Sequence, residues 1–253
     1  MEYDNIKLEE LEQEQYEMSL EQFALMVALL LNCKKDIYKE VQSFYSNFGT
    51  DGRINYRTSR KHYSDLDKRK RSVVLYSTID DILDSYFLNI EDIFRNALID
   101  IIDSEIEFFV TEVDIDDILK FKWGDDNANW NTRLWEHRDK WSKVIKKDLK
   151  LGFLRSEDIQ ELLDQLDVRF KSAEKALKKL FVTEYNAIES EARKRIFKEL
   201  GVSKFQYYAT LDERTCDECG SMHEQVFPMS AYEIGVTVPP IHSWCRCFIV
   251  PVD

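Results

Sequence analysis

Residues that interrupt helices are scarce in this sequence, and this constrains the fold more than any other feature. The chain of 253 residues contains seven glycines and four prolines, whereas average usage of the two together is roughly 12%. All four prolines lie near the C-terminal end, at Pro228, Pro239, Pro240 and Pro251. Because proline is the strongest helix breaker, the sequence predicts a mainly α fold, with a long helical body followed by a small, irregular C-terminal domain.

The first predicted helix covers residues 20–48, where apolar residues recur at alternating steps of three and four. Gly49 follows as a stop signal. The apolar face also carries Lys34. Two alternatives remain open for this face: the core side of a helical bundle, or a coiled-coil seam in which Lys34 sets the register.

Four further segments have helical patterns. Residues 72–120 combine apolar positions at helical spacing with 13 acidic side chains, which we expect on a solvated face. A basic amphipathic helix is predicted over 132–150, ending at Gly152. A third helix begins after a Ser156 N-cap, and a separate one covers 168–200, ending at Gly201 in a left-handed conformation. A short strand is predicted over 205–211.

Length and hydropathy exclude several classes of protein. At roughly 150 residues per domain, we expect a helical body over residues 1–180 and a C-terminal domain over 181–253. The longest apolar run, Phe23 to Leu31, is too short for the ~20 residues of a membrane span. The acidic N-terminus lacks the pattern of a secretory signal, so we expect synthesis in the cytoplasm.

Basic side chains are concentrated in a segment of a chain whose formal net charge is −13. Residues 51–71 contain eight of them against three aspartates, with Tyr56 and Tyr63 interleaved. This pattern favours a solvated loop, with nucleic acid or an acidic partner as the alternative. The nucleic-acid candidates are Arg53, Arg57, Arg60, Lys61, Lys68, Arg69, Lys70 and Arg71; the 138–150 helix is a second candidate surface.

Four of the five cysteines lie near the C-terminus in a metal-binding pattern. Cys216 and Cys219 form a Cys-x-x-Cys knuckle, and His242, Cys245 and Cys247 follow about 25 residues later. Thiolates and imidazoles at such spacings converge on a tetrahedral zinc ion, which takes four ligands. We expect Cys216, Cys219, His242 and one of Cys245 or Cys247, with Cys245 preferred.

Other interpretations of these residues carry less weight. His223 is a weaker candidate, because a single histidine in a polar turn is typically a hydrogen-bonding surface residue. A disulfide pair would need an oxidising compartment. A redox dithiol would open a helix in an α/β context, which is absent here. A catalytic zinc would need an open coordination position and a nearby base such as Glu213, Glu218 or Glu224.

Together these residues resemble a known family. The run from Thr210 to Cys216 with Cys219, then Pro239-Pro240 and His242-x-x-Cys245-Arg246-Cys247, is similar to the C-terminal domain of the phage Mu F-like minor head proteins, or head morphogenesis proteins. Trp123-Gly124, Asn129-Trp130 and Arg133-Leu134-Trp135 resemble the tryptophan-rich segment that precedes it, and Thr183-Glu184 resembles an Arg-Thr-Glu motif. In two departures, Val182 replaces that arginine and Ser243 replaces a proline.

The resemblance implies a virion component of the bacteriophage head, located inside the head near the portal. Its implied partners are the portal protein and capsid or scaffold components, and its implied roles are procapsid assembly and genome packaging or delivery. We expect a structural Zn²⁺ that staples a small α+β domain. Within that domain, we expect an Asp212–Arg214 ion pair to fix the first knuckle and Arg246 to support the second.

Two functions from other classes compete with this structural role, which is not enzymatic. One is a DNA-binding protein that accompanies or protects genome ends, using the basic segment. The other is a zinc-dependent nucleic-acid-processing enzyme that uses Glu184, Asp212, Glu213 and His223 around the metal. A metal fully coordinated by protein would leave no place for activated water.

Overall fold

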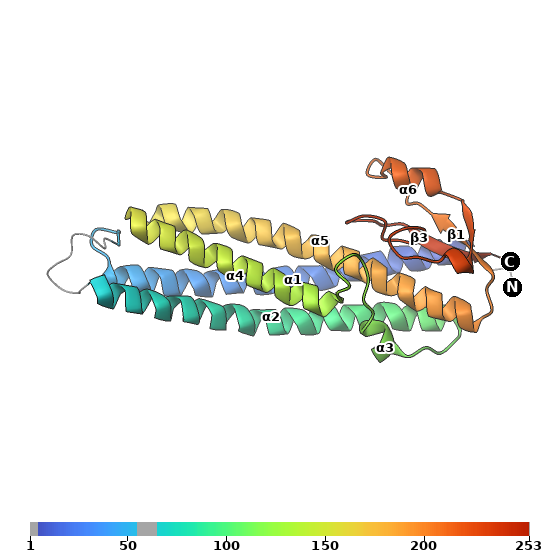
Figure 1. Ribbon diagram of the computed structural model, residues 1–253, viewed down its shortest axis with the longest axis horizontal. Helices are drawn as coiled ribbons and strands as arrows, with labels where there is room; N and C mark the ends of the chain where they lie inside the picture. Colours follow the sequence, from blue (N-terminus) through green and yellow to red (C-terminus); the bar gives the residue numbers. More distant parts are fainter. Residues whose placement is uncertain (1–4, 55–64, 253) are drawn as a thin grey trace. The chain divides into compact units, whose positions relative to one another are not determined.

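The computed structural model describes residues 5–54 and 65–252, and it confirms a mainly α fold with a small sheet near the C-terminus (Figure 1). No helix in these two ranges is long and apolar enough to cross a membrane. The elements are α1 (Asn5–Phe48), α2 (Asp65–Phe109), α3 (Ile115–Leu119), α4 (Trp130–Arg155), α5 (Ile159–Glu199), β1 (Lys204–Tyr208), α6 (Asp217–Met222), β2 (Val226–Pro228), the 3₁₀ turn η1 (Met229–Ala231) and β3 (Phe248–Val252).

The chain forms two compact units, to which the long helices contribute different parts. Unit 1 contains Met1–Ala24, Asp92–Arg133 and Lys178–Asp253, and unit 2 contains Leu25–Glu91 and Leu134–Leu177. The expected boundary between a helical body and a C-terminal domain at residue 180 stays a prediction.

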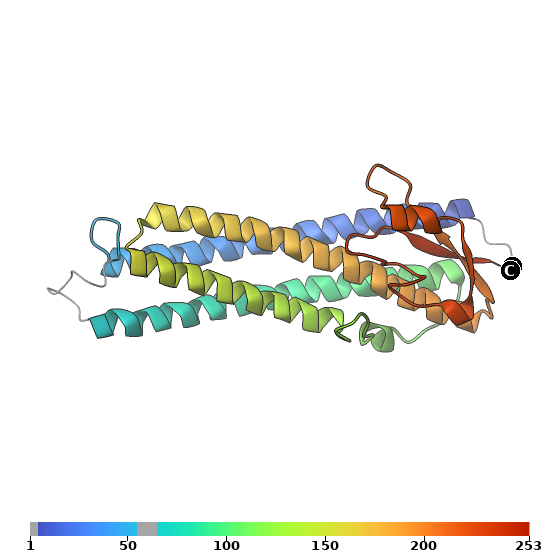
Figure 2. The ribbon, with the colours of Figure 1, turned by 45° about the horizontal axis from the view of Figure 1, so that its top comes forward.

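Unit 2 is a bundle of segments from α1, α2, α4 and α5, which run side by side (Figures 1 and 2). The predicted apolar face of α1 packs into it: the Tyr38 ring meets the edge of Phe170, and Phe44 stacks on Phe153. Lys34 forms an ion pair with Asp167 of α5. The bundle alternative is therefore confirmed, and Lys34 binds a carboxylate within the bundle instead of setting a coiled-coil register.

Most acidic side chains of α2 between residues 80 and 107 are exposed or half-buried, as expected, but some of them pair with basic residues of α4. Arg138 of α4 lies 2.6 Å from the Asp84 carboxylate and 3.4 Å from that of Asp80. Lys146 lies 2.6 Å from Asp80. Opposite charges on two amphipathic helices thus pair inside unit 2, and they neutralise part of the basic 138–150 surface that the sequence offers to DNA.

The turn between α4 and α5 differs from the predicted one in three respects. Gly152 does not end α4, which continues to Arg155; a Cβ on Gly152 would lie 2.9 Å from Leu162, so this glycine serves close helix packing. Ser156 has a φ of 54° and is not an N-cap. The two helices expected after it are one continuous helix, α5.

Asp158 is the N-cap of α5, immediately before Ile159. Its Oδ1 accepts a hydrogen bond from the Gln160 N–H at 2.8 Å, and the Glu161 carboxylate accepts one from the Asp158 N–H at 3.3 Å. This reciprocal pair is a capping box. Asp158→Ala is expected to lower the free energy of unfolding by about 1 kcal/mol in urea denaturation, whereas Ser156→Ala should change it by less than about 0.5 kcal/mol. A larger loss from Ser156→Ala would contradict this assignment.

Unit 1 joins the end of α5 to the sheet. Gly201, with a φ of 69°, ends the helix as predicted; its N–H donates to Lys198 and that of Val202 to Phe197, which is a Schellman motif. The predicted strand is confirmed as β1, the centre of an antiparallel sheet with the order β2-β1-β3.

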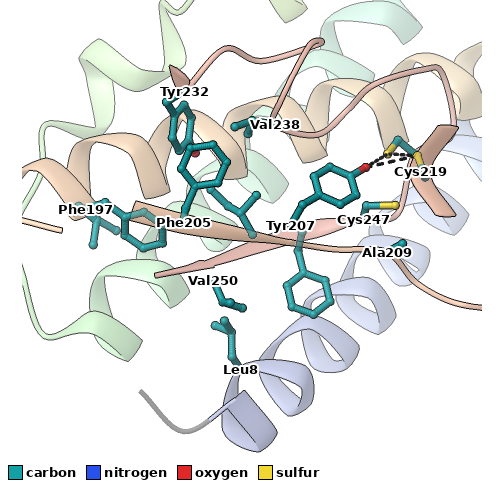
Figure 3. Packing of buried hydrophobic residues seen from close by; sticks show 14 of the residues in the cluster. Leu8, Phe197, Phe205, Tyr207, Ala209, Cys219, Tyr232, Val238, Cys247 and Val250 are labelled. Atoms are coloured by element: carbon teal, nitrogen blue, oxygen red, sulfur yellow. Dashed lines mark hydrogen bonds between the residues drawn. The ribbon is translucent and has the colours of Figure 1, made fainter. Parts of the chain in front are cut away.

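The core of unit 1 lies around this sheet (Figure 3). Phe205 of β1 packs against Tyr232, with ring centroids 5.0 Å apart. Leu8 of α1 and Val250 of β3 are both buried and point toward one another in Figure 3. The segments that carry the cysteines follow β1 and precede β3. The sheet therefore fixes one end of each of these segments.

Candidate metal centre

The first knuckle is built at the start of α6. Cys216 is the N-cap of this helix, and its Sγ accepts a hydrogen bond from the Cys219 N–H at 3.3 Å. Because cysteine replaces the usual capping oxygen, the helix start places two sulfurs on the same side and supplies an amide to one of them. The structure thus brings the two sulfurs of the predicted knuckle within 4.8 Å of one another.

His242 joins this knuckle from the second segment. Its Nε2 lies 3.1 Å from Sγ of Cys216 and 3.3 Å from Sγ of Cys219. Its Nδ1 lies 2.8 Å from the Ser243 carbonyl oxygen, a partner that fixes the ring orientation. A tetrahedral ion bound at ~2.3 Å from sulfur and ~2.0 Å from nitrogen keeps its ligands about 3.5–3.8 Å apart. The two sulfur–nitrogen distances are slightly shorter than that separation.

Cys245 and Cys247 bring two more sulfurs to Cys219. The Sγ atoms of Cys219 and Cys245 are 3.9 Å apart, and the donor atoms of Cys219, Cys245 and Cys247 lie within 4.8 Å of one another. Cys219 thus belongs to two groups of potential ligands, one completed by Cys216 and His242 and the other by the C-terminal pair. Thiols and imidazoles are typical metal ligands. This cluster could therefore hold a metal ion.

A small cavity distinguishes the two C-terminal cysteines. It measures about 20 Å³ and is lined by Cys216, Cys219, His242 and Cys247, but not by Cys245. A space of this size accepts a single small occupant such as a water molecule or an ion.

Tyr207 is a member of the cluster that sequence reasoning missed. It is fully buried on β1, and its hydroxyl donates to Sγ of Cys219 at 3.3 Å (Figure 3). Alternation along β1 places Tyr207 and Phe205 on the same buried face, but no sequence signal shows that the hydroxyl reaches a sulfur. The related signal in the sequence is the aromatic run over residues 205–208, which precedes the knuckle.

Protonation differs among the sulfurs. Burial raises the pKa of Cys219 to about 12. The interaction between the two side chains raises the pKa of Cys245 and lowers that of Cys247. Because zinc binds thiolates, a bound ion must displace protons from this cluster, and its affinity falls as the pH is lowered.

The loop before α6 is fixed by a different ion pair from the one predicted. The carboxylate of Asp212 accepts a hydrogen bond at 2.7 Å from the guanidinium of Arg246 and one at 2.8 Å from the Arg214 backbone N–H. The Arg246 interaction holds the pKa of Asp212 below its usual range. The expected Asp212–Arg214 ion pair is wrong, because Arg214 contributes its backbone and Arg246 supplies the charge that joins the two segments.

His223 is not brought into either group of ligands. Its Nδ1 accepts a hydrogen bond from the Ala209 N–H at 3.2 Å, and its ring meets Tyr208 edge to face. Glu184, another residue of the enzymatic alternative, is buried and bonded to residues outside the ligand groups. Arg133 lies 2.6 Å from its carboxylate, and the Trp123 indole N–H donates to it at 3.0 Å. These contacts join the tryptophan-rich segment to the Thr183-Glu184 motif.

Helix α5 also fastens the cysteine segment. Asn186 donates to the carbonyl oxygens of Cys247 at 3.1 Å and Cys245 at 3.4 Å. Further along α5, Arg193 donates to the Ile249 carbonyl oxygen at 3.1 Å. The second half of the cluster is therefore positioned by side chains of a rigid helix as well as by β3.

Arg193 is the centre of a buried charged cluster that the sequence analysis missed. Its guanidinium bonds both oxygens of Glu105, at 2.7 and 2.8 Å, and lies 2.5 Å from Glu12 and 3.1 Å from Glu189. A signal was present, because Glu105 continues the series of apolar residues on α2 at the spacing of an inward position.

The nucleic-acid candidates are only partly described. Arg57, Arg60 and Lys61 lie outside the described residues, as do the side chains of Lys68 and Arg69. The backbone of Arg53 forms bridges to Thr50 and Asp158, and its side chain is exposed, as is that of Lys70. The guanidinium of Arg71 lies over the Phe48 ring at 4.9 Å.

The cavity lining gives a prediction that separates Cys247 from Cys245, contrary to the sequence preference. Cys247→Ser is expected to lower the bound zinc per chain at least tenfold under competition with a chelator, because it removes a sulfur that lines the small cavity. Cys245→Ser should keep most of the zinc. Elemental analysis of the two purified variants checks this, and the reverse order would assign the fourth ligand to Cys245.

Comparison with known proteins agrees with the motifs. Residues 143–250 match the family described as Phage Mu protein F like protein, a segment that contains all the cysteine and histidine residues of the cluster. Searches of curated proteins and of solved structures each gave no match. The family points to a bacteriophage head-related protein with capsid-related partners. Residues 143–250 are therefore similar to the Phage Mu protein F like family.

Proposed function

We propose that this chain is a minor head protein of a bacteriophage, associated with the portal and acting in procapsid assembly and in genome packaging or delivery. The observation that carries the proposal is the Mu F-like match over residues 143–250, which contains the whole Cys/His cluster. The role is structural: the helices provide docking surfaces, and the C-terminal segment is held by its cluster and by α5.

The cluster holds one structural Zn²⁺, with Cys216, Cys219, His242 and Cys247 as ligands. These residues fit the ion because three sulfurs and one imidazole are a common structural donor set, and they line one small cavity. Four protein ligands leave no open position for water, which supports a non-enzymatic role. Among the described residues, neither ligand group contains Glu184, Asp212, Glu213 or His223.

The test is co-expression of the tagged chain with the portal and capsid proteins of the same phage. The portal protein should be retained through a wash at high salt and should be found with the chain in assembled particles. Retention of neither the portal nor a capsid protein, and absence of the chain from purified virions, would remove the proposal. Competition by DNA alone, lost when Arg53 and Lys70 are neutralised, would instead favour the genome-binding alternative.

A further inference from the structure

Unit 1 contains a second, larger cavity that the proposed function does not use. It measures about 640 Å³ and lies among the α1 segment 12–19, the α5 segment 182–189 and the loops that follow β1 and precede β3. Cavities of 300–1,000 Å³ are typical of sites for small ligands or side chains.

Two residues that line the cavity each have a buried amide oxygen without a hydrogen-bond partner among the described residues. These are Oε1 of Gln15 and Oδ1 of Asn186, whose residues are 2% and 8% exposed. Their orientations are fixed, because the amide nitrogen of Gln15 donates to the Glu105 carboxylate and that of Asn186 to backbone carbonyls. A buried acceptor without a donor is unfavourable by roughly 1–3 kcal/mol, so a ligand that brings a hydrogen-bond donor to either oxygen would be stabilised.

Among the described residues, the carboxylates at the lining outnumber the cations paired with them. Glu12 and Glu189 line the cavity, and both share the single guanidinium of Arg193 with Glu105. Burial is the main cause that raises the pKa of both Glu12 and Glu189. The one arginine in the described lining, Arg246, bonds Asp212.

The remaining walls are suited to an apolar stem and a cation. The aromatic residues in the lining are Tyr16, Tyr185, Tyr208 and Phe248. Phenol faces attract ammonium and guanidinium groups and also pack against methylene chains. His223, whose Nδ1 accepts from the Ala209 N–H, belongs to the same wall.

We propose that this cavity is a binding site for an organic cation with an apolar stem, either a guanidinium or an alkylammonium group. The group donates to Gln15 and Asn186, balances Glu12 and Glu189, and places its stem against the tyrosines. Its source is either an arginine or lysine side chain of a partner protein or a free polyamine. The inference does not depend on the proposed head function.

The test is calorimetric titration of the metal-loaded full chain with defined probes. N-acetylarginine amide represents a protein side chain, putrescine represents a polyamine, and N-acetylcitrulline amide has the shape of the first without its charge. We expect saturable binding of at least one cation, at least about tenfold tighter than the citrulline probe. Tighter binding of the arginine probe assigns the site to a protein side chain, and tighter binding of putrescine to a polyamine. Equal binding of citrulline, or no saturable binding of any cation, would overturn the proposal.

Variants locate the binding site. Glu12→Gln is expected to weaken cation binding at least about fivefold, whereas Glu14→Gln, the same change at an exposed position of α1 outside the lining, should leave it unchanged. Val182→Arg adds a tethered guanidinium at the wall and should abolish probe binding, while Val182→Met adds length without charge and should weaken it less. Equal effects of Glu12→Gln and Glu14→Gln, or of the two Val182 variants, would contradict a cation site here.

Discussion

Replacing Cys216 with serine is expected to release the metal and unfold the C-terminal segment while unit 2 keeps its structure. The substitution removes one ligand and the sulfur that caps α6. Because metal binding contributes directly to the folding free energy of such small regions, we expect a loss on the order of 4 kcal/mol or more. The helices of unit 2 pack through their own core of apolar side chains and do not need the ion.

Hydrogen exchange measures this prediction region by region. Amides of β1 and β3 should lose protection in the Cys216→Ser variant, while those of α4 between residues 134 and 155 should keep it. Cys33→Ser is the matched control: Cys33 is a buried free cysteine of unit 2 outside both ligand groups. It should retain zinc and protection in β1. An unchanged β1 in Cys216→Ser would show that the sheet folds without the metal.

Replacing Arg193 with methionine is expected to have a second large effect, since it leaves three buried carboxylates without their cation. Arg193 is 1% exposed and is bonded or paired to Glu12, Glu105 and Glu189. Removing one partner from a buried ionic cluster costs roughly 3–5 kcal/mol. The variant also loses the hydrogen bond to the Ile249 carbonyl oxygen, which fastens β3.

The pH dependence gives this prediction a sign. Burial already raises the pKa values of Glu12 and Glu189 above that of an ordinary glutamate, and removal of Arg193 should raise them further. A group with a raised folded-state pKa stabilises the fold at low pH, and this contribution is lost as the pH rises toward the folded-state pKa. The loss of stability in Arg193→Met should therefore be smaller at pH 5 than at pH 7.5.

The control for this variant is Arg195→Met on the same helix. Arg195 is partly exposed and pairs with Asp117 and Glu191, so its removal should cost about 1 kcal/mol or less. Urea denaturation at the two pH values compares the variants. Equal losses from Arg193→Met and Arg195→Met would mean that the buried cluster contributes no more than a surface ion pair.

Local patterns predicted the parts of the fold that depend on neighbouring residues. The absence of proline before Pro228 correctly predicted long helices. Gly201 ends α5 in the predicted left-handed conformation. The same reasoning was wrong at Gly152 and Ser156, because a glycine that permits close packing has the same appearance in a sequence as one that ends a helix. Asp158 offered an equally good cap signal two residues later.

The candidate site also combines features that the sequence predicted with features that it did not. The spacing of Cys216, Cys219 and His242 predicted that they converge, and their donor atoms lie within 4.8 Å of one another. The hydrogen bonds from Tyr207 and Asn186 depend on how β1 and α5 pack against the cysteine segment, and no spacing reveals them. Pairing of Asp212 with Arg246 instead of Arg214 likewise depends on a contact across 34 positions of sequence.

The most direct measurement of the central claim is the metal content and coordination of the purified chain. Elemental analysis should give about one zinc per chain, and X-ray absorption should show three sulfur ligands and one nitrogen ligand. Thiol titration of the native protein should then find the cluster cysteines protected until a chelator is added. A metal-free chain whose four C-terminal cysteines react freely, or form disulfides, with β1 and β3 still folded, would contradict the account.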